Sequence, residues 1–207
     1  VASKDLNPYF LYGEKAMEYL KKKDKKLAKV IDEYGFIRRT INHDLFYSLI
    51  ECIIGQQIST KAQKTICKRL KDALPIVNVD TVLTFGKDNI QALGMSYKKA
   101  ENIISIAQRI KDREIDLESL KMKKDEEIIK ELSSLPGIGT WTAEMLMLHS
   151  LDRMDILSYK DLAIQRGICK VYHHKELDKK RFERYKKRFS PYGSIASIYF
   201  WEVSKEG

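Results

Sequence analysis

The sequence predicts an all-α fold, and three observations support this prediction. Apolar residues recur at helical spacing along most of the chain, for example over residues 45–54 and 100–110. No segment shows the sustained alternation of apolar and polar residues that marks a half-buried β-strand. The four prolines all lie between the periodic segments, as expected of a residue that breaks helix interiors: Pro8, Pro75, Pro136 and Pro191.

Polar residues mark where several of these helices are expected to begin. A side-chain oxygen just before a helix can accept a hydrogen bond from a backbone N–H group that has no partner inside the helix. Ser59, Ser96 and Asp125 each stand just before a periodic segment. A further periodic segment begins after Asp161, which therefore occupies a predicted helix start as well.

The order of the helical segments predicts two lobes. We expect residues 45–164 to form one lobe, and residues 1–44 together with 165–207 to form the other, so that the 207 residues make one helical unit. A cleft between two lobes is a usual place for a ligand.

Charge points to a polyanionic partner. Lys and Arg number 38 against 29 Asp and Glu, which gives a formal net charge of +9 and makes nucleic acid the leading candidate. The lysine-rich runs at 21–23 and 121–124 are read as solvated faces rather than as dedicated contacts.

Cysteine usage and hydropathy bear on the location of the protein. The three cysteines form no CxxC pair, so we expect buried, unpaired thiols in a reducing compartment, and hence a cytoplasmic, nucleoid-associated protein. No stretch of about 18 uncharged apolar residues and no signal-peptide pattern is present, so no membrane association is expected.

The most informative run is Leu-Pro-Gly-Ile-Gly-Thr-Trp-Thr-Ala at residues 135–143, between two periodic segments. Pro136 ends the first helix, while Gly137 and Gly139 permit backbone angles and close approaches that a Cβ would obstruct. The N–H groups at the start of the second helix can then hold a phosphate. Taken alone, the run also fits an ordinary helical hairpin with a glycine-containing turn.

Over its full length this run resembles the helix-hairpin-helix signature of the base-excision DNA glycosylase superfamily. The resemblance implies that the expected cleft holds DNA and an active site. It also implies that amides near three hairpin residues contact a DNA phosphate: Gly137, Gly139 and Thr142. Three backbone carbonyls are implied to bind a monovalent cation when DNA is present: Ser133, Leu135 and Ile138.

Asp161 is the candidate catalytic residue. A capping role at the helix start would explain it by itself, and the helix dipole there favours a carboxylate. However, Asp161 follows Trp141 by twenty residues, a spacing that matches the catalytic aspartate of this superfamily. Residues 155–167 resemble the bacterial 3-methyladenine DNA glycosylase II family, although that family often has proline where Ser158 stands and rarely has lysine at position 160.

The chemistry expected of Asp161 is electrostatic. Cleavage of a glycosidic bond builds oxocarbenium character on the sugar, which a nearby carboxylate stabilises, and the same group can activate the attacking water. In bifunctional relatives a lysine nucleophile occupies the position of Trp141, so the resemblance implies a monofunctional enzyme. Lys160 is either a solvated or DNA-contacting cation that keeps Asp161 ionised, or a second nucleophile.

Residues 54–62 resemble a second hallmark of the family, a Gly-Gln-Gln-(Ile/Leu)-Ser turn between helices. Such a turn could fill the gap that a flipped nucleotide leaves, with Gln57 or alternatively Ile58 as the plug. A capped interhelical turn is the plainer interpretation of the same residues. Three further polar residues could reach phosphates beside the turn or could be ordinary surface residues: Lys61, Ser96 and Lys98.

Aromatic residues could form a pocket for the extruded base. Trp141 and Tyr159 are candidates for stacking, with core packing an equal alternative for Tyr159, and Tyr192 could border the cleft. Trp201 is assigned to the core of a final helix that resembles the family's. An aromatic wall suits a cationic alkylated purine.

The resemblance also implies what is missing. With three cysteines, the chain cannot supply the four-cysteine iron–sulfur loop of many related enzymes, and we expect no required cofactor. No strand pattern matches the N-terminal β domain of some relatives, so a compact form without that domain is expected. We also expect a monomer. Two other functions stay open: a glycosylase for oxidised or deaminated purines, and a non-catalytic DNA-binding module.

Overall fold

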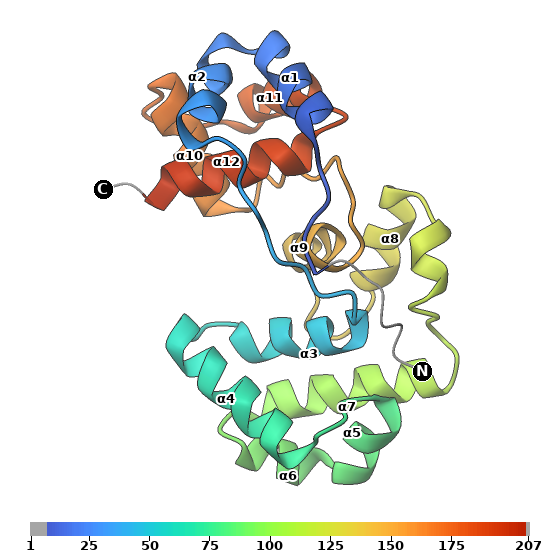
Figure 1. Ribbon diagram of the computed structural model, residues 1–207. Coiled ribbons are helices and arrows are strands. Elements are labelled where there is room, and N and C mark those ends of the chain that lie inside the picture. The colour runs from blue at the N-terminus through green and yellow to red at the C-terminus, as the bar shows by residue number, and fades with distance from the viewer. Residues whose placement is uncertain (1–7, 206–207) are drawn as a thin grey trace. The chain divides into compact units, whose positions relative to one another are not determined.

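The computed structural model describes residues 8–205. Within that range it contains twelve α-helices, one short 3-10 helix and no β-strand, apart from an isolated bridge between Tyr9 and Thr40 (Figure 1). The all-α prediction is therefore confirmed for the described part of the chain. The chain divides into two compact units, residues 44–146 and residues 8–43 with 147–205.

The unit of residues 44–146 holds the hairpin. Its helices are α3 (Leu45–Gly55), α4 (Thr60–Ala73), α5 (Val79–Phe85), α6 (Lys87–Ala92), α7 (Tyr97–Lys111), the 3-10 helix η1 (Ser119–Met122), α8 (Asp125–Leu132) and the beginning of α9 (Thr140–Ser150). The long helix α7 packs against α3, α5 and α6. Its buried face includes Ile103 and Ala107, and α3 contributes Leu49 and Ile53 to the same unit's core.

Two of the predicted helix starts are capped as expected. The Ser59 side chain accepts a hydrogen bond from the Ala62 amide ahead of α4, and the Ser96 side chain accepts one from the Lys99 amide ahead of α7. Asp125 is different, because α8 begins at Asp125 itself. Aspartate is favourable in the first turn of a helix as well as before it, so its residue type does not separate the two positions.

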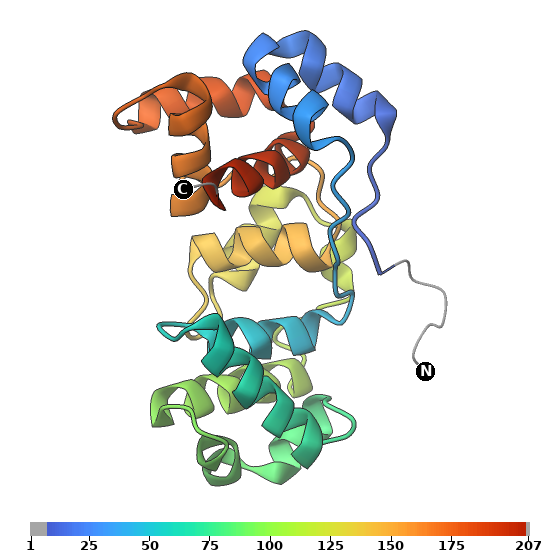
Figure 2. The same ribbon diagram turned by 60° about the vertical axis from the view of Figure 1, so that its left-hand side comes forward.

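The other unit combines the N-terminal and C-terminal segments of the described chain. It contains α1 (Glu14–Lys23), α2 (Lys25–Tyr34), the end of α9, α10 (Leu162–Tyr172), α11 (Lys179–Phe189) and α12 (Gly193–Lys205). Both views show α12, in red, alongside α10, in orange, with the blue helices of the N-terminal half beside them (Figure 2). The two helices make close backbone contact, because a Cβ on Gly167 of α10 would collide with the carbonyl oxygen of Phe200 on α12.

The division between units falls after residue 146 rather than at the predicted residue 164. The intervening loop is hydrogen-bonded to the start of α12: the Gly193 amide donates to Asp155 at 3.0 Å, and the Ile156 amide donates to the Ser194 hydroxyl at 2.9 Å. These bonds attach the segment before α10 to the C-terminal helices. None of the helices in residues 8–205 combines the length and apolar character that a bilayer crossing requires.

Candidate functional site

The hairpin is a tight turn between α8 and α9. Its backbone closes on itself in three places: the Leu135 amide donates to the Leu132 carbonyl, the Ile138 amide donates to the Leu135 carbonyl, and the Ala143 amide donates to the Gly139 carbonyl, all at 2.9–3.1 Å. First-turn amides of a helix have no acceptor within the helix. The turn therefore leads directly into the amides of α9, the helix end that favours anions.

Glycine stands at positions 137 and 139 of the hairpin for different structural reasons. Gly137 has φ +80°, in the left-handed region, and a Cβ there would collide with the side-chain amide of Asn102. At Gly139 φ is not in that region, and a Cβ would meet nothing within 4 Å. The fold thus requires glycine at 137, whereas at 139 it leaves room for a group from outside the protein.

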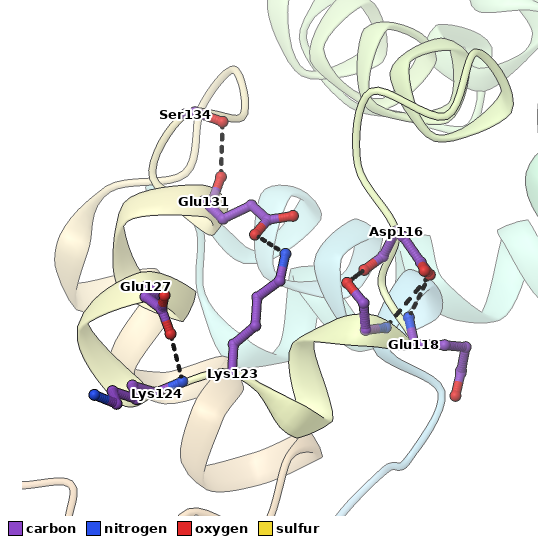
Figure 3. Close-up of polar contacts among 8 residues, drawn as sticks. Asp116, Glu118, Lys123, Lys124, Glu127, Glu131 and Ser134 are labelled. Carbon is purple, nitrogen blue, oxygen red and sulfur yellow. Dashed lines mark hydrogen bonds and ion pairs between the residues drawn. The ribbon is translucent and has the colours of Figure 1, made fainter.

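One ion pair and several hydrogen bonds hold the first helix of the hairpin, and Figure 3 shows most of them. The Lys123 ammonium pairs with Glu131, and the Lys124 amide donates to the Glu127 carboxylate at 2.9 Å. After the helix, the Ser134 hydroxyl donates to the Glu131 carbonyl at 2.7 Å, and Arg109 donates to the Ser134 carbonyl at 2.8 Å. These contacts fix the chain on the approach to residue 135.

A second turn in the same unit, at residues 56–59, is bonded to the hairpin. The Gln56 side-chain amide donates to the Gly137 carbonyl at 2.7 Å. The Lys99 ammonium donates to the Ile54 carbonyl at 2.8 Å and to the Gln56 carbonyl at 2.5 Å, at the C-terminus of α3. Burial lowers the pKa of Lys99. Sequence reasoning missed Gln56 and Lys99, because no local pattern shows which distant carbonyls they reach.

The predicted contact residues beside this turn are at the surface. Gln57 is exposed with φ +57°, and Ile58 is 36% exposed. Lys61 and Lys98 are exposed too, and Lys98 forms an ion pair with Glu101 at 2.8 Å. The hydroxyl of Ser96, also exposed, caps α7.

In the hairpin itself, Trp141 is 43% exposed on the first turn of α9, while Thr142 is buried. Of the carbonyls expected to bind a cation, that of Leu135 accepts the Ile138 amide. Residues 8–205 contain no group of three or more His, Cys, Asp or Glu side chains that could hold a metal ion. Their three cysteines are free, but only Cys67 is buried as predicted, whereas Cys52 and Cys169 are partly exposed.

Asp161 lies in the other unit, buried at the N-terminus of α10. Its Oδ1 accepts a hydrogen bond from the Ile164 amide at 2.9 Å, so the capping interpretation is correct. The same oxygen accepts a bond from the indole Nε1 of Trp201, on α12, at 3.3 Å. A cap needs no such partner, and two donors from different helices fix the orientation of this carboxylate.

Trp201 was predicted to be a core residue and is indeed buried, yet its polar edge faces Asp161. Two further groups lie against its ring. His149, on α9, stacks on it with ring centroids 5.5 Å apart and planes at 18°, and the Arg39 guanidinium carbon lies 4.9 Å from the indole centroid. Burial and the charge of Arg39 lower the pKa of His149 to about 4, against the opposing influence of Asp161.

The other aromatic candidates contact ring neighbours of their own. The ring of Tyr159 packs edge-on against Phe182, with centroids 5.2 Å apart, and the ring of Tyr192 packs edge-on against Tyr19 at the same separation. Lys160 is exposed.

Comparison with known proteins identifies the family. Residues 50–191 match the HhH-GPD superfamily base excision DNA repair protein family. The chain belongs to this family. The matched segment contains both the hairpin and Asp161, so the resemblance predicted from those residues is confirmed. Among curated relatives, DNA-3-methyladenine glycosylase 1 of Schizosaccharomyces pombe is 27% identical over 186 residues, which are 87% of this chain and 82% of that protein.

Solved structures of this family have the same fold. A DNA-3-methyladenine glycosidase from Bacillus halodurans superposes with a TM-score of 0.85 at 28% identity, over 95% of this chain and 92% of that one. The Schizosaccharomyces pombe 3-methyladenine DNA glycosylase, in a complex with abasic DNA, superposes with a TM-score of 0.79 at 26% identity, over 93% of this chain and 98% of that one.

Proposed function

We propose that this protein is a monofunctional DNA glycosylase of base-excision repair. It turns a damaged base out of duplex DNA and hydrolyses its N-glycosidic bond, leaving an abasic site. The observation that carries the proposal is the buried carboxylate of Asp161, whose Oδ1 is oriented by both the Ile164 amide and the Trp201 indole. Family membership supports the same conclusion.

Asp161 supplies the electrostatic part of the reaction. As the bond to the base breaks, positive charge develops on the deoxyribose. A carboxylate already fixed in orientation stabilises that charge without reorganising during the reaction. It can also orient or deprotonate the attacking water.

The proposed substrate is an alkylated purine, which is supported by relatives named 3-methyladenine glycosylases. A cationic alkylated base is a good leaving group, so little acid catalysis is needed. Trp141 has the exposed indole to stack on such a base through cation–π attraction. Pocket roles for Tyr159 and Tyr192 stay predictions, since each ring has a protein neighbour.

The proposed DNA contacts are of two kinds. Amides near Gly137, Gly139 and Thr142 hold a backbone phosphate, with a monovalent cation on the hairpin carbonyls when DNA is bound. Such contacts position the protein without reading sequence. Exposed Gln57, or alternatively Ile58, enters the gap left by the flipped nucleotide.

The proposal is tested by a base-release assay on duplexes carrying 3-methyladenine, 7-methylguanine, hypoxanthine or 8-oxoguanine in parallel. We expect release of the methylated purines and an intact abasic strand. Preferential release of hypoxanthine or 8-oxoguanine would reassign the substrate class. Tight binding with no release from any duplex would instead indicate a non-catalytic DNA-binding module.

A further inference from the structure

Arg39 is a partly buried cation that takes no part in the reaction steps proposed above. It lies in the segment after α2, where its carbonyl accepts the Phe10 amide at 2.8 Å. Burial lowers its pKa, although the charge of Glu202 opposes this effect. Removing a guanidinium from water costs free energy unless other groups compensate. The π face of Trp201, 4.9 Å from the guanidinium carbon, provides part of that compensation.

The contact of Arg39 with the Trp201 ring matters because the edge of the same ring is hydrogen-bonded to Asp161. The indole Nε1 of Trp201 donates to Asp161, so rotation of the ring would remove that hydrogen bond. Arg39 and His149 both lie against the ring and restrict its rotation. Arg39 is thus linked to Asp161 through the Trp201 ring, which it contacts on one side and which donates to the carboxylate through Nε1.

The same cation acts on His149. The charged or polar groups facing this imidazole are Arg39 from the segment after α2, Asp161 at the start of α10 and the Trp201 ring of α12. An imidazolium beside Asp161 would offset the negative charge that the proposed reaction uses. Burial, helped by the charge of Arg39, lowers the pKa of His149 to about 4 and keeps the imidazole neutral near pH 7.

We infer that Arg39 is a positioning residue for Asp161: it fixes the Trp201 indole that orients the carboxylate, and it opposes a competing positive charge on His149. The role in catalysis rests on the proposed glycosylase function. The positioning itself does not, because it can be measured on the protein without substrate.

The test compares Arg39→Met with Arg39→Lys, which keeps the positive charge. One measurement is single-turnover base release from pH 4.5 to 8. In Arg39→Met we expect the rate at pH 7.5 to fall by about tenfold. We also expect an acidic loss of rate at higher pH than in the wild type, because His149 becomes easier to protonate. Arg39→Lys should restore the wild-type pH profile.

The second measurement is NMR of the free protein. The chain has two tryptophans, so Trp201→Phe assigns the Trp201 indole N–H resonance. In Arg39→Met we expect this proton to exchange faster with water and the His149 pKa to rise. Unchanged indole exchange and an unchanged His149 pKa would overturn the positioning role. If the spectra change as expected but the wild type releases no base, the proposed function fails and the positioning stands.

Discussion

The side-chain amide of Gln56 donates a hydrogen bond to the carbonyl oxygen of Gly137, a residue 81 positions later in the chain. The bond joins the turn after α3 to the hairpin, and the Lys99 ammonium donates to the backbone carbonyl of the same Gln56. The turn at residues 56–59 and the hairpin at residues 135–143 are far apart in the sequence, yet they adjoin within the unit of residues 44–146.

Loss of this bond should weaken DNA binding. In Gln56→Ala the hairpin turn keeps its own backbone bonds but loses its connection to the neighbouring turn. The variant hairpin must then be ordered on binding, at a cost of at most the about 1 kcal/mol that a hydrogen bond contributes, so we expect the Kd for an abasic-site duplex to rise by up to about fivefold. Gln108→Ala, which removes an exposed glutamine of α7 paired with Asp112, is the matched control. Equal affinities of the two variants would argue against a joint surface.

Gly139→Val separates folding from DNA binding. A Cβ at 139 meets no protein atom within 4 Å, so the unfolding free energy should change by less than about 1 kcal/mol. The affinity for all duplexes should fall regardless of sequence, because the added side chain obstructs a backbone–phosphate approach. Gly137→Ala should instead destabilise the protein, because it collides with Asn102 and φ is positive. A folded Gly139→Val protein with normal DNA affinity would contradict the phosphate contact.

Asp161→Asn should remove catalysis while keeping the structure. Asparagine caps a helix about as well as aspartate, and its carbonyl oxygen can still accept from Ile164 and Trp201. Abasic-site DNA should therefore bind as before, while base release slows by on the order of 10²-fold or more. The two quantities are measured by titration and by single-turnover release. Turnover near the wild-type rate would remove Asp161 from its proposed role.

Borohydride trapping tests the monofunctional mechanism. With Trp141 at the position of the Schiff-base lysine, we expect no covalent adduct between the wild-type protein and lesion-containing DNA. Lys160 is the residue that could behave otherwise, since it adjoins Asp161 and is exposed. An adduct that forms with the wild type and disappears in Lys160→Ala would show a bifunctional enzyme.

Local signals account for the parts of the structure that the sequence predicted. Ser59 and Ser96 cap helices that begin at the next residue, because capping involves groups only a few positions apart. Asp161 was predicted at a helix start for the same reason. Contacts between distant segments were not predictable in this way. The bond from Trp201 to Asp161 spans 40 residues, and apolar spacing shows only that Trp201 is buried, not which acceptor its indole finds.

Tyr159 shows that the direction of a side chain is also hard to predict from its neighbours in the sequence. It is two residues from Asp161, and either a place in the base pocket or core packing was predicted for it; its ring packs edge-on against Phe182 of α11, while the pocket role stays a prediction. Side chains of neighbouring residues in an irregular segment can point in different directions. Closeness in sequence therefore keeps two backbones close but does not bring their side chains together.

The contact between Gly167 and Phe200 determines how closely α10 approaches α12, and each helix carries one partner of the Asp161–Trp201 bond. One additional methyl group at 167 would push the helices apart and lengthen a bond that forms six residues away along α10. A survey of inactivating mutations should therefore find damage at Gly167, a buried glycine packed against the backbone of another helix. In this enzyme, a substitution that changes the distance between α10 and α12 should therefore reduce activity even when it leaves every side chain of the site in place.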